Sequence, residues 1–190
     1  MYGSIGEPNR SFVVGMSGSG KTTWIKNEVV HHPRVLVWDW RREYPYSPVS
    51  LGDLPALFSE PSFHRTFQPN PLGDLNGQFQ ALALCLLLLS GSRDFTLVVD
   101  EAYLVCPNYQ EGGLGKLLRL SRTNNIELII SSQRPTLVPG VFVSESKRII
   151  LFHLHKIEDL RWLRSYVDTA TLEQVPRMQK FQYLEVPLML

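Results

Sequence analysis

Cysteine is scarce in this sequence: two residues, Cys85 and Cys106, occur in a chain of 190. Their separation matches no metal-ligand spacing, and two cysteines are too few for a disulfide framework. The scarcity excludes the small disulfide-rich secreted folds. It predicts that both thiols are reduced and buried, in a protein of the cytosol.

Long hydrophobic runs and an excess of charge are also missing. The longest purely apolar run, residues 81–89, has nine residues, whereas a membrane-spanning helix needs about 20, so we expect a core helix there. The N-terminus lacks the basic-then-apolar order of a signal peptide, and nothing argues for export. With 19 basic and 18 acidic residues the net charge is +1, which excludes a polycation that coats nucleic acid. Any contact with nucleic acid must come from a local cluster of basic residues.

Short apolar segments alternate with helical patterns along a chain whose length fits one domain, residues 1–190. The expected strands are a short one closed by Val13 and Val14, then residues 34–39, 63–68, 95–99, 126–130, 148–155 and, at a sheet edge, 181–186. The expected helices are residues 21–32, 76–90, 114–123 and 156–167. This alternation predicts an α/β fold with a mainly parallel central sheet and helices on both faces.

Ligands of such sheets bind beyond the carboxyl ends of the strands. Polar residues follow four of the expected strands at that edge: the loop 15–22, Asp39, the pair Asp100 and Glu101, and Gln133. The sequence therefore predicts one site along this rim of the sheet.

The loop after the first strand fits the phosphate-binding pattern G-x-x-x-x-G-K-[ST] at Gly15, Gly20, Lys21 and Thr22. Glycines let backbone N–H groups surround an anion, and the following helix adds the partial positive charge of its N-terminus. Lys21 would reach the β- and γ-phosphates of ATP, and the Thr22 hydroxyl would bind Mg²⁺. The expected nucleotide-binding residues are Gly15, Ser17, Gly18, Ser19, Gly20, Lys21, Thr22 and Thr23.

The acidic pair is the second candidate group. Asp100 ends an apolar strand, which suits binding to Mg²⁺, and Glu101 could polarise a water molecule for attack on the γ-phosphate. A glutamate in this role favours hydrolysis over transfer to a small acceptor. Gln133 could sense the γ-phosphate or orient the water, although "SSQRP" could equally be turn chemistry before a proline.

Arg119 and Arg122 lie three residues apart on one expected helix face. Arg119 is interpreted as a solvated surface residue. Arg122 is a candidate arginine finger that enters the site of a neighbouring subunit, which predicts a ring. The sequence alone leaves the choice between the two arginines open.

Four segments together resemble the FtsK/HerA superfamily of DNA-translocating ATPases over about residues 11–167: "GMSGSGKTTW", "VLVWDWRREY", "TLVVDEAY" and "LSRTNNIELIISSQRP". The resemblance implies a RecA-like P-loop NTPase of the ASCE type. Such motors are usually hexameric, use ATP and Mg²⁺, and pump double-stranded DNA through a central channel. It also implies that Arg122 is the trans-acting finger and Gln133 the sensor, and that Asp39 and Glu43 match the motif of the second strand.

Larger members of that superfamily carry an N-terminal β-barrel, membrane helices or a winged helix, for which this chain has no room. A bare motor of this size resembles the genome-packaging ATPases of tailless, membrane-containing double-stranded DNA viruses. The resemblance implies a motor that packages a viral genome into a preformed capsid. It would work in the host cytoplasm, docked at a virion vertex through a capsid or membrane protein.

Three other functions stay open at this point. They are a nucleotide-dependent phage assembly or secretion factor that acts on protein, an ATPase for conjugative-type DNA transfer, and a small P-loop kinase. The kinase would need an arginine-rich lid, and the sequence offers no convincing one. The candidate DNA contacts are the loop 103–113 and the segment 134–148, in which Lys147 and Arg148 are the available basic residues.

Overall fold

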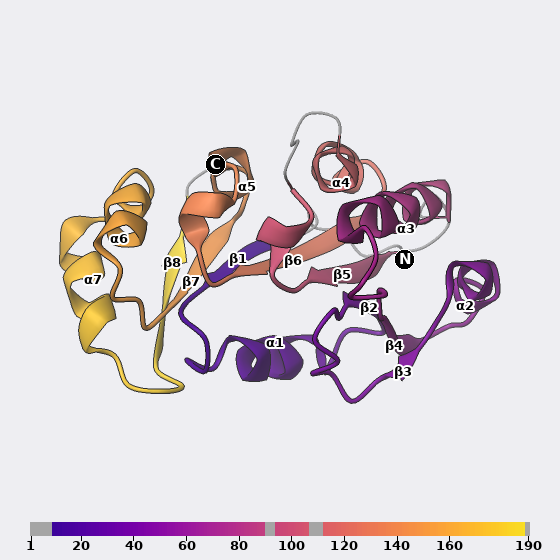
Figure 1. Cartoon of the computed structure of the whole chain (residues 1–190), viewed down its shortest axis with the longest axis horizontal. Helices are drawn as coiled ribbons and strands as arrows, with labels where there is room; N and C mark the ends of the chain where they lie inside the picture. The colour runs from indigo at the N-terminus through magenta and orange to yellow at the C-terminus, as the bar shows by residue number, and fades with distance from the viewer. Residues whose placement is uncertain (1–8, 90–93, 107–111, 189–190) are drawn as a thin grey trace, which may run out of the picture.

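The structure, a computed structural model, describes residues 9–89, 94–106 and 112–188. Over these ranges it contains one eight-stranded sheet with the order β3-β4-β2-β5-β6-β1-β7-β8 (Figure 1). The strands are β1 Arg10–Val14, β2 Arg34–Trp38, β3 Ser47–Pro48, β4 Phe63–Phe67, β5 Phe95–Val99, β6 Ile126–Ser132, β7 Arg148–Phe152 and β8 Tyr183–Pro187. All neighbouring strands are parallel except β7 and β8, which run antiparallel. The predicted mainly parallel sheet is confirmed.

Helices cover both faces of the sheet, as predicted (Figure 1). The helices are α1 Lys21–Val29, α2 Leu54–Leu57, α3 Leu75–Leu89, α4 Gly113–Ser121, α5 Gly140–Ser144, α6 Ile157–Leu163 and α7 Thr169–Gln174. Helix α1 lies on one face, whereas α3, α4 and α5 lie on the other. Helices α6 and α7 lie beyond the β8 edge.

Two hydrophobic cores follow from the alternation of side chains along the strands. In β1, Phe12 and Val14 pack in the core on the α3 side, whereas Val13 packs in the core on the α1 side. Every residue of β1 and β5 is buried, which is the pattern of parallel strands covered on both faces. The polar residues that end these strands are thus held on a rigid frame.

The apolar run 81–89 lies in α3, as expected. Leu82 and Leu86 are in the core, whereas Leu84 and Leu88 are exposed. No helix in the described ranges has the length and apolar character needed to span a bilayer.

The thiols differ from the expectation that both are buried. Cys106 is buried, and its burial raises the pKa of the thiol to about 11, whereas Cys85 is only half-buried.

Several short elements have no counterpart among the expected ones: β3, α2, α5 and α7. Each has six residues or fewer and is too short to carry a clear period in sequence. Some expected elements also end early, since α1 stops at Val29, β7 at Phe152 and α6 at Leu163.

Candidate functional site

The phosphate-binding loop connects the buried strand β1 to α1, where the motif requires it. Gly18 and Gly20 have φ angles of 74° and 119°, a left-handed conformation that glycine adopts without strain. Helix α1 begins at Lys21, so its N-terminal N–H groups follow the loop directly. A loop of this shape can surround the phosphates of a nucleotide.

Lys21 is buried at the base of this loop. Its Nζ donates hydrogen bonds to the carbonyl oxygens of Gly15 (2.9 Å) and Met16 (3.2 Å). Burial lowers the pKa of Lys21, while Glu101 and Asp100 oppose this shift by favouring the charged form. The predicted phosphate ligand and the predicted acidic pair therefore share one site.

The phosphate-binding loop, the start of α1 and the segment 180–181 before β8 line a cavity of about 330 Å³. Its lining residues are Ser17, Gly18, Gly20, Lys21, Thr22, Thr23, Glu43, Lys180 and Phe181. Two residues predicted to bind nucleotide do not line it. Gly15 packs against β7, where an added Cβ would collide with the Cβ of Phe152, and the side chain of Ser19 is buried.

Ser131, the next-to-last residue of β6, holds both acidic residues that follow β5. Its Oγ donates a hydrogen bond to Asp100 Oδ1 and accepts one from the backbone N of Glu101 (3.2 Å). Sequence reasoning gave Ser131 no role. Its only signal there was its position as a polar residue near the end of a strand that is rich in isoleucine and leucine.

Glu101 is fixed from the neighbouring strand by Gln133. The backbone N of Gln133 donates to Glu101 Oε2 (3.2 Å), and its side-chain Nε2 donates to Oε1. Glu101 is itself in the left-handed region, with a φ of 56°, which costs free energy for a residue with a side chain. The structure thus brings together the predicted water-polarising residue and the predicted sensor.

Burial raises the pKa of Asp100 from its usual 3.8 to about 6, against the opposing effect of the Ser131 hydrogen bond. The nearby charge of Glu101 acts in the same direction as burial. An ionised Asp100 therefore costs free energy in the protein without bound ligand.

The Asp100→Asn variant is accordingly expected to be more stable than the native protein at pH 7.5, by on the order of 2 kcal/mol. Because the pKa of Asp100 is higher in the folded than in the unfolded chain, the free energy of unfolding of the native protein falls as the pH rises from the unfolded pKa to the folded one. Here that range is about 4 to 6. The gain should be full above pH 6 and vanish below pH 4. Urea unfolding at a series of pH values measures it.

Asp94 provides the matched control, because it lies at the opposite end of β5 and is exposed. Asp94→Asn should leave the free energy of unfolding within about 0.5 kcal/mol of the native value. Equal stability of Asp100→Asn and the native protein at pH 7.5 would contradict the buried charge.

Thr22 meets the loop that follows β2. Its Oγ1 donates to Glu43 Oε2 (3.1 Å). Asp39, which is 1% exposed, accepts hydrogen bonds from the backbone N of Glu43 (2.9 Å) and Tyr44 (3.1 Å). Asp39 therefore shapes the loop that carries Glu43, while Glu43 itself reaches the site.

The oxygen atoms of Thr22 and Asp100 fit the preference of Mg²⁺ for hard oxygen ligands. Among the described residues, no group of three or more His, Cys, Asp or Glu side chains is placed to hold a metal ion by itself. A cation here would take its remaining ligands from phosphates and water, as Mg²⁺ does in nucleotide sites.

The arginines lie away from this cavity. Arg122 caps the C-terminal end of α4, and both it and Arg119 are exposed. Neither belongs to the described residues that line the cavity. The predicted role of Arg122 therefore requires the site of another subunit.

Arg148, one of the two basic residues proposed for contact with DNA, is engaged within the fold. Arg148 bonds to Glu28, to Glu185 (3.1 Å) and to Ser11 (2.8 Å), which leaves its guanidinium little capacity for phosphates. In the loop 103–113, residues 107–111 lie outside the described ranges.

No protein-family model and no curated protein matches the sequence. Solved structures do match. The genome packaging NTPase B204 of Sulfolobus turreted icosahedral virus 2 has a TM-score of 0.77 at 21% identity, covering 95% of this chain and 93% of that chain. VirB4 of Thermoanaerobacter pseudethanolicus has a TM-score of 0.71 at 12% identity, covering 100% and 92%. The type VII secretion ATPase EccC of Thermomonospora curvata has 0.53 at 16%, covering 80% of this chain and 20% of that one.

These neighbours are P-loop proteins, and B204 is known in complex with AMP, AMPPCP and ATP-gammaS. The match of B204 and VirB4 over most of the chain confirms the expected fold class. The chain has the P-loop ATPase fold of the viral genome packaging NTPase B204 and of VirB4.

Proposed function

We propose that this protein is an ATP-hydrolysing motor that moves double-stranded DNA and packages a viral genome into a preformed capsid. The observation that carries the proposal is the position of Glu101, which Gln133 holds through two hydrogen bonds in the site that contains Lys21. The likeness of the fold to B204, a genome packaging NTPase, supports DNA packaging in particular.

Each residue of the site has a distinct task in this proposal. The loop N–H groups and Lys21 bind the phosphates, and Thr22 and Asp100 hold Mg²⁺, which neutralises phosphate charge. Glu101 polarises the attacking water, and Gln133 keeps the Glu101 carboxylate oriented and senses the γ-phosphate. Ser131 positions the acidic pair.

The proposed working form is a ring, with a hexamer as the expected size. Arg122 is exposed at the end of α4 and does not line the cavity of its own subunit, so in a ring it would act in the site of the next subunit. In the virus such a ring would act in the host cytoplasm at a virion vertex, bound to a capsid or membrane protein.

Double-stranded DNA is expected to increase the rate of ATP hydrolysis several-fold. Contacts to phosphates are salt-sensitive and independent of sequence, so two duplexes of unrelated sequence should stimulate equally, and the stimulation should fall between 50 and 200 mM salt. The measurement is phosphate release at saturating Mg-ATP with and without duplex DNA, read together with the mass of the protein in solution. An unchanged rate, from a chain that stays monomeric with ATP, would count against a DNA motor.

A second function, an ATPase for secretion or conjugative-type DNA transfer, is favoured by the similarity to VirB4 and to the secretion ATPase EccC. For an ATPase that acts on protein, hydrolysis is expected to be indifferent to DNA and to rise with a membrane or coat protein. The same phosphate-release assay distinguishes an ATPase that acts on protein from a motor that acts on DNA.

A further inference from the structure

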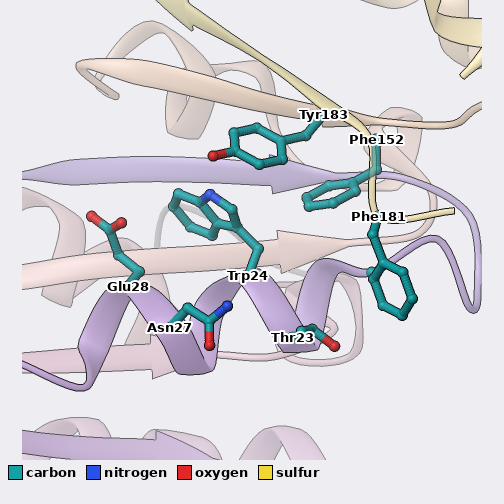
Figure 2. A pocket seen from close by; sticks show the side chains of 8 residues that line it. Thr23, Trp24, Asn27, Glu28, Phe152, Phe181 and Tyr183 are labelled. Atoms are coloured by element: carbon teal, nitrogen blue, oxygen red, sulfur yellow. The ribbon is translucent and has the colours of Figure 1, made fainter. Parts of the chain in front are cut away.

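A second cavity, of about 400 Å³, lies beside the phosphate-binding loop, between α1 and the antiparallel strands β7 and β8 (Figure 2). It is lined by Gly20, Thr23, Trp24, Asn27, Glu28, Phe152, Phe181 and Tyr183. Gly20, Thr23 and Phe181 also line the cavity at the loop. The two cavities are therefore adjacent, and Phe181 lies at their junction.

The inner wall of this second cavity is aromatic and already packed. The rings of Trp24 and Tyr183 are 6.3 Å apart at 68°, and those of Phe152 and Tyr183 are 5.6 Å apart at 38°. The guanidinium of Arg148 lies 5.4 Å from the centre of the Trp24 ring. Figure 2 shows these rings side by side above α1, with Asn27 and Glu28 rising from its next turn. Such a wall offers an apolar, aromatic surface without rearrangement.

Phe181 is held at the junction in a strained conformation. Its φ is 69°, a value that side-chain-bearing residues rarely adopt. Its backbone N donates a hydrogen bond to the carbonyl oxygen of Ser19 (2.8 Å). The ring approaches Gly20 so closely that an added Cβ there would lie 2.8 Å from Phe181 Cδ1. Nevertheless, Phe181 remains 54% exposed, so this arrangement leaves an aromatic ring open to the cavity.

We infer that the second cavity binds the purine base of the nucleotide and that Phe181 is the residue on which the base stacks. The inference rests on the proposed function, which places the triphosphate in the loop. With the phosphates at Lys21, the sugar and base leave the loop past Thr23, along the first turn of α1, and reach the aromatic wall. The side-chain amide of Asn27, exposed on the next turn, has no hydrogen bond to any described residue and can pair with the polar edge of a purine.

The test compares two ligands, Mg-ATP and inorganic tripolyphosphate, by calorimetry on the native protein and on Phe181→Gly. Base stacking on an aromatic ring is worth about tenfold in affinity or more, so Phe181→Gly should bind ATP about tenfold more weakly and bind tripolyphosphate as the native protein does. Glycine suits a φ of 69°, so the variant should melt at or above the native temperature. Phe181→Trp should restore ATP affinity.

Leu72→Ala is the matched control, because Leu72 is an apolar residue 95% exposed in the turn before α3. This variant should bind both ligands as the native protein does. If Phe181→Gly binds ATP with the native affinity, the proposed base site is overturned. An equal loss of affinity for ATP and tripolyphosphate would also overturn it, because Phe181 would then act on the phosphate-binding loop through its hydrogen bond to Ser19. A native protein that binds neither ligand would instead overturn the proposed function.

Discussion

Replacing Glu101 with glutamine is expected to reduce ATP hydrolysis by about 100-fold or more while leaving ATP bound. Glutamine has nearly the same shape but cannot take up a proton from the attacking water. It also has one oxygen in place of the two that accept from the Gln133 backbone and side chain. Single-turnover phosphate release measures the loss, and equilibrium binding of Mg-ATP measures what is retained.

The matched control is Glu173→Gln, the same chemical change at an exposed position of α7. This variant should hydrolyse ATP at the native rate. Native turnover by Glu101→Gln, with binding intact, would show that the base lies elsewhere and would remove the observation on which the ATPase proposal depends.

Replacing Arg122 with alanine is expected to reduce hydrolysis by about 1,000-fold, the usual worth of an arginine finger. The effect should reverse on mixing with Glu101→Gln, although neither variant is active alone. A subunit with an intact Glu101 then receives Arg122 from its neighbour. With equal amounts and random assembly, half of the sites have the base and half of those have the finger, so roughly a quarter of native activity should return.

Arg119→Ala is the control for this mixing experiment, because Arg119 is exposed on the same helix one turn earlier. If Arg119→Ala, and not Arg122→Ala, loses hydrolysis and regains it on mixing, then Arg119 is the arginine finger. If neither variant regains activity in mixtures, catalysis does not pass between subunits.

The sequence predicts those parts of the site that depend on a local pattern of residues. The phosphate-binding loop has a fixed spacing of residue types, and β5 and β6 are mostly apolar segments with polar residues at their carboxyl ends. Because parallel strands end on one rim, Glu101 and Gln133 were expected near each other, and the structure places them in direct contact.

The parts that were missed depend on contacts between distant segments. Lys180 and Phe181 reach a loop some 160 residues earlier in the sequence, and no local pattern indicates that approach. Ser131 acts only through its partners on β5. Arg148 looked like an available cation in sequence, yet folding surrounds it with carboxylates.

Substitution of each of the three glycines of the loop is unfavourable for a different reason, which matters for the interpretation of variants at these positions. Gly18 has open space around it but a left-handed backbone, and Gly20 has both that backbone and an aromatic ring against it. At Gly15 an added Cβ would collide with the Cβ of Phe152. A loss of activity in Gly15→Ala would therefore reflect disturbed packing between the end of β1 and β7, and would not show how phosphate is bound.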